Sequence, residues 1–252
     1  MRPLSERDRP GRLRRRAAEP APEAAPAVDR QAPPPDTDRD TDRASAALPT
    51  VPDDVLRACR RALAELGDVA MSGLAITSTE RQEGRSTVAL GAALMLRQRS
   101  ERKVVLVELD FERPSLAATM GLVPTDGLAG VLRGERRVVE CLSWVTPTFA
   151  VLQAGSGGVD DDASRTGAAL REVLAELQEL GYLVVADLPP LPPHGRGDTM
   201  VDLFSATILV VRAGRTRLPA VRSAVRLLAV PPAVVLNGKS SAVPRWVRAL
   251  GV

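Results

Sequence analysis

Short runs of apolar residues alternate along the chain with longer segments in which apolar residues recur at helical spacing. The runs are apolar at nearly every position, as in strands that are buried on both faces of a sheet. These runs predict strands at 72–77, 103–108, 149–152, 182–187, 207–211 and 233–237. The segments around them predict helices at 52–66, 86–98, 114–120, 127–133, 164–180, 198–204, 218–228 and 244–250. Strands that alternate with helices predict an α/β fold with a doubly wound, mostly parallel sheet.

The first 48 residues lack this pattern and are rich in Arg, Pro, Ala and Asp. They hold too little apolar surface to offset the entropy cost of ordering the chain. We therefore expect residues 1–48 to be a disordered tail and residues 49–252 to form one globular domain. The arginine cluster at 12–16 is typical of a solvated tail, and it is also a composition that contacts anionic lipid or acidic protein.

Composition narrows the function classes. Of the 252 residues, 44% are hydrophobic, which is enough for a core, but only 2% are aromatic, which argues against a surface that stacks on nucleic-acid bases. Two cysteines are too few for a disulfide framework and favour the reduced cytoplasm. No apolar run reaches the roughly 18–20 residues that span a bilayer. We expect a cytoplasmic protein without a nucleic-acid partner.

The most informative segment is the loop between the first predicted strand and the helix that follows it. It ends in Gly84-Arg85-Ser86-Thr87, and a strand, a tight loop and a helix in this order are typical of a P-loop. In such a loop, backbone N–H groups and the helix N-terminus surround a phosphate, and the hydroxyl after the basic residue faces Mg²⁺. The standard pattern is G-x-x-x-x-G-K-S/T, so Thr79 replaces the first glycine and Arg85 replaces the lysine. An ordinary strand-to-helix turn with a hydroxyl cap is the alternative.

Carboxylates follow two further predicted strands. Glu108 and Asp110 come at the end of the strand 103–108, and Asp187 ends the strand 182–187. Since parallel strands end at the same edge of a sheet, we expect these side chains to meet near the phosphate loop. Paired carboxylates beside phosphates hold Mg²⁺ or accept a hydroxyl proton, and an Asp that closes an apolar strand is the Walker B arrangement. A helix-capping acidic loop and an Asx turn are the alternatives.

In this order, the three segments resemble the bacterial tyrosine kinases (BY-kinases) of capsule and exopolysaccharide synthesis, which are ParA/MinD-type P-loop ATPases. The resemblance runs from about residue 50 to about residue 240. Asp187 is followed by Leu-Pro-Pro, similar to that family, and the last two strands end in Arg212 and Asn237 at matching places. The residues shared in the first two segments are Thr77, Ser78, Glu83, Gly84, Ser86, Thr87, Asp110, Arg113 and Pro114.

The resemblance implies ATP and Mg²⁺ as cofactors. It implies that Ser86, Glu108, Asp110 and Asp187 hold the metal, and that Arg85 and the three carboxylates have catalytic roles. Asn237 would read the adenine, although a turn residue before a glycine would look the same. The residues implied for nucleotide binding are Thr79, Glu83, Gly84, Arg85, Ser86, Thr87, Arg212 and Asn237.

The predicted first helix resembles an assembly element of the same family. BY-kinases carry a Glu-x-x-Arg-x-x-Arg helix that docks on a neighbouring subunit to form a ring. Asp54, Arg57 and Arg60 resemble it and share roughly one helix face, although a solvated face would look the same. The resemblance implies a homo-oligomer with a transmembrane polysaccharide co-polymerase as activating partner. The protein would then work in the cytoplasm, at the inner face of the cell membrane.

Some residues depart from the family. Arg85 replaces the phosphate-binding lysine with a planar group that does not fit the same cradle unchanged. Gln82 replaces a glycine where the loop is expected to need a positive φ. The single tyrosine, Tyr182, excludes autophosphorylation on a C-terminal tyrosine cluster. Three hypotheses follow: a BY-kinase-like enzyme with weak or altered phosphoryl transfer, a catalytically dead scaffold that regulates the co-polymerase, and a ParA/MinD-like positioning ATPase.

Overall fold

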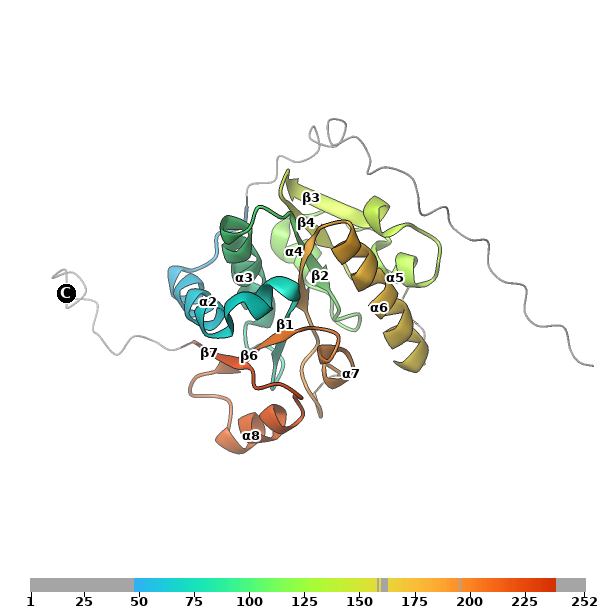
Figure 1. Ribbon diagram of the computed structural model, residues 1–252. Coiled ribbons are helices and arrows are strands. Elements are labelled where there is room, and N and C mark those ends of the chain that lie inside the picture. Colours follow the sequence, from blue (N-terminus) through green and yellow to red (C-terminus); the bar gives the residue numbers. More distant parts are fainter. Residues whose placement is uncertain (1–47, 158, 160–162, 195, 239–252) are drawn as a thin grey trace, which may run out of the picture. The chain divides into compact units, whose positions relative to one another are not determined.

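The computed structural model describes residues 48–157, 159, 163–194 and 196–238. The predicted helix 244–250 lies outside these residues, as does the predicted tail 1–48 except for its last residue. The strands are β1 (Leu74–Ser78), β2 (Val104–Glu108), β3 (Leu142–Thr146), β4 (Phe149–Leu152), β5 (Leu183–Asp187), β6 (Ala206–Arg212) and β7 (Ala233–Asn237). They form one sheet in the order β3-β4-β2-β5-β1-β6-β7 (Figure 1).

Every neighbouring pair in this sheet is parallel except β3 with β4, which is antiparallel. β4 and β7 coincide with the strands predicted at 149–152 and 233–237, and the other predicted strands differ by one or two residues at one or both ends. The predicted fold class, a doubly wound and mostly parallel α/β sheet, is confirmed.

Seven α-helices lie in the part of the chain that the structure describes, together with the short 3-10 helices η2 (Gly67–Ser72) and η3 (Val138–Cys141). None of them is long and apolar enough to cross a bilayer. The α-helices are α2 (Asp53–Leu66), α3 (Arg85–Arg99), α4 (Leu116–Met120), α5 (Gly127–Leu132), α6 (Ala163–Glu179), α7 (Asp198–Val201) and α8 (Leu218–Arg226), of which α7 is shorter than the predicted 198–204.

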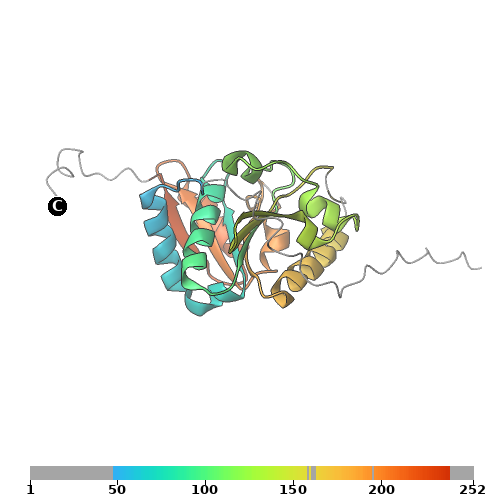
Figure 2. The same ribbon diagram turned by 90° about the horizontal axis from the view of Figure 1, so that it is seen from above.

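The seven α-helices cover both faces of the sheet. α2 and α3 pack against one face, and α5 and α6 pack against the other (Figure 1). Successive strand residues alternate between two cores: Ile76 and Leu106 face α2 and α3, whereas Ala75 and Val105 belong to the opposite core. The view from above shows α2 and α3 side by side (Figure 2). Burial on both faces explains why the strands are apolar throughout.

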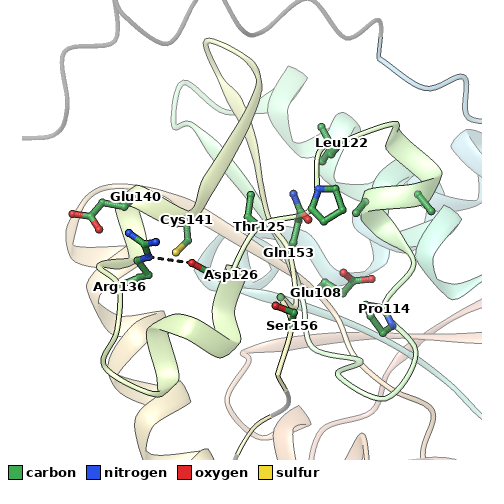
Figure 3. A pocket seen from close by; sticks show the side chains of 14 residues that line it. Glu108, Pro114, Leu122, Thr125, Asp126, Arg136, Glu140, Cys141, Gln153 and Ser156 are labelled. Atoms are coloured by element: carbon green, nitrogen blue, oxygen red, sulfur yellow. Dashed lines mark hydrogen bonds and ion pairs between the residues drawn. The ribbon is translucent and has the colours of Figure 1, made fainter.

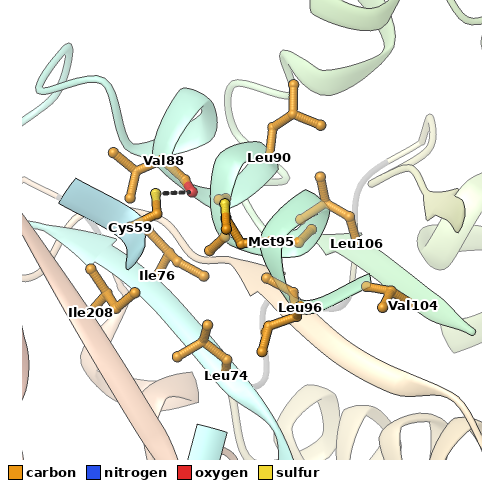
Figure 4. Packing of buried hydrophobic residues seen from close by; sticks show 14 of the residues in the cluster. Cys59, Leu74, Ile76, Val88, Leu90, Met95, Leu96, Val104, Leu106 and Ile208 are labelled. Carbon is orange, nitrogen blue, oxygen red and sulfur yellow. Dashed lines mark hydrogen bonds between the residues drawn. The ribbon is translucent and has the colours of Figure 1, made fainter. Parts of the chain in front are cut away.

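The core under α2 and α3 fixes the position of the phosphate loop. Leu74 and Ile76 of β1 pack with Leu96 of α3, and all three are fully buried (Figure 4). The Cys59 thiol of α2 donates a hydrogen bond to the carbonyl of Val88 at 3.5 Å, and burial raises the pKa of Cys59 to about 12. Because β1 and α3 share this core, the loop that joins them has fixed ends.

The sequence pattern does not predict β3. This strand pairs with β4 at the edge of the sheet, and Ser143, Trp144 and Thr146 in it are partly exposed. A strand with one open side does not need a continuous apolar run, so it lacks the signal that identifies the buried strands.

Candidate functional site

The loop from β1 to α3 turns at a glycine that no other residue can replace without strain. Gly84 precedes α3 with φ +85°, a left-handed conformation that favours glycine. A Cβ atom at Gly84 would lie 2.0 Å from Nδ2 of Asn237. Gln82 also has a positive φ, 63°, which confirms the conformation expected where the family has glycine. A residue with a side chain therefore holds a left-handed conformation at this point of the loop.

The Glu83 side chain accepts hydrogen bonds from other residues of the loop and from residues at the end of β6 and just after it. Its Oε2 atom accepts hydrogen bonds from the backbone N–H of Thr79 at 2.8 Å, the hydroxyl of Thr79 at 2.8 Å and the N–H of Glu80 at 3.0 Å. Its Oε1 atom accepts the N–H of Arg212 at 3.3 Å and the hydroxyl of Thr216. The carboxylate is buried, and neutral donors surround it.

Arg212 and Asn237, at the ends of the last two strands, also bind this loop. Arg212 Nη1 donates to the carbonyl of Gln82 at 2.9 Å, and Asn237 Nδ2 donates to the carbonyl of Glu83 at 2.8 Å. Asn237 Oδ1 accepts the N–H of Gly238 at 2.8 Å. The structure thus brings the two predicted nucleotide-binding residues to the phosphate loop, where both contact its backbone. Their nucleotide contacts remain a prediction.

Arg85 lies between the carboxylates at the ends of β2 and β5. Its Nε donates to Oδ1 of Asp187 at 2.7 Å, and its Nη2 donates to Oδ2 of Asp110 at 2.7 Å. Arg85 is 11% exposed, and the two carboxylates are 3% or less exposed. A second guanidinium, that of Arg81, lies 3.5 Å from Asp110 and bonds the exposed Glu112 at 2.6 Å. The predicted convergence of Arg85, Asp110 and Asp187 is therefore present.

These contacts change the protonation of the buried groups. Burial by itself lowers the pKa of Arg85, but the charges and hydrogen bonds of Asp187 and Asp110 outweigh it and raise that pKa. Burial raises the pKa of Asp187, and the nearby Arg85 charge opposes this rise. Asp187 Oδ2 is the one buried side-chain oxygen or nitrogen without a hydrogen-bond partner among the described residues. This oxygen forms no hydrogen bond of normal geometry with the described residues, although the nearby Ser86 side chain lowers the pKa of the carboxylate.

Glu108 has other partners than Asp110. Its Oε1 accepts the N–H groups of Ser115 at 2.5 Å and Leu116 at 2.8 Å, and its Oε2 accepts the N–H of Ala154 at 3.3 Å. Burial raises the pKa of Glu108, although these hydrogen bonds act in the opposite direction. Its carboxylate thereby holds the start of α4 against the end of β4. The predicted metal-binding and catalytic roles of Glu108 remain predictions.

Magnesium is the cation that the predicted site would hold, so the fit of the residues to Mg²⁺ can be tested. Among the described residues there is no group of three or more His, Cys, Asp or Glu side chains arranged to hold a metal. Two carboxylates converge, but the Arg85 guanidinium bonds both of them. Ser86, the hydroxyl expected to face the metal, lies with its Oγ 3.2 Å from Oγ of Ser115. As arranged here, these residues do not fit Mg²⁺, because the Arg85 guanidinium already lies between the two carboxylates that would bind it.

The predicted assembly residues are on an open helix face. Asp54, Arg57 and Arg60 are exposed on α2, while the opposite face of α2 is buried through residues that include Val55 and Cys59. This arrangement leaves them accessible to another molecule. Their role in a homo-oligomer remains a prediction.

A cavity that the sequence does not predict opens beside Glu108. Its volume is about 750 Å³, and its lining comes from α4, η3 and the loops near the ends of β2 and β4 (Figure 3). Arg136 and Asp126 form an ion pair of 3.1 Å at its wall. Gln153, at the end of β4, donates to the carbonyl of Val123 and the hydroxyl of Ser143, both at 2.9 Å. A polar residue directly after the buried strand 149–152 was the only sequence signal for this cavity.

Comparison with known proteins supports the fold assignment. No protein-family model and no curated protein matches the chain. The solved VpsO kinase domain is 24% identical, with a TM-score of 0.63, over 73% of this chain and 93% of that chain. The kinase domain of Escherichia coli tyrosine kinase ETK is 20% identical, with a TM-score of 0.62, over 75% of this chain and 78% of that one.

A ParA/MinD-type structure is similar as well. The septum site-determining protein MinD from Pyrococcus horikoshii OT3, solved as a complex with Mg-ADP, is 19% identical, with a TM-score of 0.51, over 71% of this chain and 76% of that chain. The chain therefore has the fold of the BY-kinase domains and ParA/MinD-type ATPases. The resemblance found in the sequence is confirmed at the level of the fold.

Proposed function

We propose that this protein is a BY-kinase-like subunit of an exopolysaccharide or capsule system that acts as a catalytically inactive scaffold or regulator. Its fold is that of the kinase domains described above. The observation that carries the proposal is the position of Arg85, which bonds Asp110 and Asp187 at 2.7 Å each.

Phosphoryl transfer depends on cations directed at the phosphate oxygens. In a P-loop the lysine provides such a charge, but here the residue in its place is held by two carboxylates. A nucleotide would have to compete with both carboxylates for the guanidinium. Loss of one well-placed phosphate contact typically lowers the rate by roughly 10²–10³-fold. We therefore expect at most slow turnover.

The only tyrosine is not available as an internal substrate. Tyr182 is 7% exposed, and its ring packs near Trp144 with the ring centres 6.2 Å apart. It precedes β5, whereas Asp187 ends this strand of five residues, so the length of the strand, about 17 Å, separates them. A phosphorylated residue would have to be on a partner.

A second candidate function is a weakly active ATPase or kinase. It is favoured by Asp187 Oδ2, which is buried without a partner, and by the retained hydroxyl of Ser86 in the first turn of α3. In this case Arg85 would leave the carboxylates and contact the phosphates, and Ser86 and Asp187 would hold Mg²⁺ if it bound. Mg²⁺ would supply positive charge to the phosphates.

The proposed partner is a transmembrane polysaccharide co-polymerase, contacted from the cytoplasm at the inner face of the membrane. The exposed α2 face with Asp54, Arg57 and Arg60 is the proposed contact between copies of the chain. Both proposals are supported by the sequence resemblance and by the accessibility of this face. The test is co-purification of this protein with a co-expressed co-polymerase, and of two differently tagged copies of the chain with each other. A variant with the charges of Asp54, Arg57 and Arg60 reversed is the comparison.

Turnover measurements decide between the two candidate functions. ATP hydrolysis and phosphate transfer to a tyrosine-containing polymer are measured for the native protein, Arg85→Lys and Asp187→Asn. A scaffold predicts that the native protein and Asp187→Asn are equally inactive, and that Arg85→Lys gains at least about tenfold. Native turnover that Asp187→Asn abolishes would instead establish the enzyme.

A further inference from the structure

We propose that the Arg85 guanidinium takes the place of a divalent cation between Asp110 and Asp187, so that the native protein excludes metal and loss of the guanidinium opens a metal site. The inference deepens the proposed function and rests on it for the identity of the site. It does not depend on the polysaccharide partner.

The geometry of the bridge is the first support. Asp187 ends β5, and Asp110 lies two residues after Glu108, the end of β2; the two strands pair in parallel with Glu108 opposite Asp187. Different nitrogens of one guanidinium reach them, Nε to Asp187 and Nη2 to Asp110, each at 2.7 Å. These are short, charge-assisted hydrogen bonds in a nearly closed space, where ion pairs are screened less than in water. A single cation thus links two strand ends, as a bound metal would.

The charges of the cluster are the second support. Arg85, Asp110 and Asp187 together carry a net charge of −1. The guanidinium of Arg81, 3.5 Å from Asp110, offsets this negative charge. A divalent cation would have to displace Arg85 from both carboxylates and then remain beside its charge. Like charges at such short distances are unfavourable. Mg²⁺ should therefore not enter while Arg85 is in place.

The unused oxygen of Asp187 is the third support. Asp187 Oδ2 is buried without a partner among the described residues, which is costly for a carboxylate oxygen and indicates an incomplete ligand set. Replacing Arg85 by a neutral residue would free Asp187 Oδ1 and Asp110 Oδ2 next to it. Oxygen atoms from two carboxylates, completed by water, are ligands that Mg²⁺ and Mn²⁺ prefer. Glu108 would not join them, because three backbone N–H groups hold its carboxylate.

The test is Mn²⁺ binding without nucleotide, measured by electron paramagnetic resonance, together with the melting temperature in Mg²⁺ or Mn²⁺. The proteins are the full chain and its variants Arg85→Gln and Arg85→Lys. We expect no saturable binding to the native protein at about 5 mM metal, and binding at least tenfold tighter by Arg85→Gln, with a metal-dependent rise in Tm. Arg81→Gln is the matched control, because Arg85 remains in place, and it should behave as the native protein does.

Arg85→Lys keeps the test valid if Arg85→Gln does not fold. Lysine retains the charge, but its point charge cannot bridge two carboxylates as a planar fork does, so it should admit Mn²⁺ more weakly than glutamine. Adding Asp187→Asn to the variant that binds should abolish binding. Saturable binding by the native protein, or none by any folded Arg85 variant, would overturn the inference.

The outcomes separate this inference from the proposed function. Native Mn²⁺ binding without ATP turnover would overturn the inference and leave the scaffold proposal standing. Native turnover that needs no divalent cation would overturn the scaffold proposal and leave the inference standing.

Discussion

The phosphate loop contributes to two buried carboxylate clusters whose oxygen atoms accept hydrogen bonds from different kinds of donor. In the Glu83 cluster, neutral N–H and O–H groups of Thr79, Glu80, Arg212 and Thr216 surround the carboxylate. In the Arg85 cluster, formed with Asp110 and Asp187, a guanidinium bonds two carboxylates, and one oxygen of Asp187 has no hydrogen-bond partner within the described part of the chain.

The difference separates a structural role from a chemical one. Donors that belong to the backbone cannot leave without unfolding the loop, so the Glu83 cluster fixes geometry. A long side chain can move away from its partners, and a carboxylate with a free oxygen can accept another ligand. The Arg85 cluster is therefore where a substitution should change what the protein binds, and the Glu83 cluster is where it should change stability.

Removing the Glu83 carboxylate should have the largest effect on stability. Glu83→Ala leaves several buried donors without an acceptor, each worth about 1–3 kcal/mol, so we expect a loss of at least about 3 kcal/mol in the free energy of unfolding. Urea denaturation measures it. The control Glu80→Ala removes a carboxylate that accepts none of these bonds and should cost about 0.5 kcal/mol or less. Equal losses in the two variants would contradict a structural role for Glu83.

A methyl group at Gly84 should have the next largest effect. Gly84→Ala forces a left-handed conformation on alanine and displaces Asn237 Nδ2 from its bond to the Glu83 carbonyl, so we expect a loss of about 2 kcal/mol. Gly134→Ala is the matched control. Gly134 has φ +73°, but its added Cβ would meet nothing within 4 Å. The contact with Asn237 predicts that Gly84→Ala costs more than Gly134→Ala, and similar costs in urea denaturation would refute it.

A smaller, pH-dependent effect is expected at Glu108, a further buried carboxylate outside these two clusters. Burial raises its pKa on folding, so the stability that it contributes is complete below the ordinary value of 4.5 and is lost as the pH rises through the folded value. Glutamine does not titrate. The stability of Glu108→Gln relative to the native protein should therefore increase as the pH rises above 4.5. Urea denaturation at several pH values measures the free energy of unfolding of both proteins. A difference between them that does not change with pH would contradict a raised pKa of Glu108.

Much of the fold was predictable because the buried strands appear in the sequence as continuous apolar runs. A strand covered on both faces must be apolar throughout, and β4 and β7 were located to the residue. The edge strand β3 was not predictable, since its partly exposed Ser143 and Thr146 break the apolar run. A rule about strand ends also sufficed to bring Arg85, Asp110 and Asp187 together.

The partners within the site were less predictable. Glu108 and Asp110 are two residues apart, but β2 ends at Glu108, so the alternation of a strand does not determine the direction of Asp110. One bonds backbone N–H groups and the other bonds Arg85. Which donor each carboxylate meets depends on loops whose course the residue pattern does not encode. The cavity beside Glu108 depends on the same loops.

Arginine at position 85 also limits which chemical changes in the cell can alter the charge of the site. A lysine there could be acetylated, and a buried lysine can lose its proton, so its charge would depend on the state of the cell. The guanidinium is not a target for lysine acetylation, and its pKa is raised further by Asp187 and Asp110 against the effect of burial. The positive charge between the strand ends is therefore independent of lysine acetylation and of pH changes in the cell.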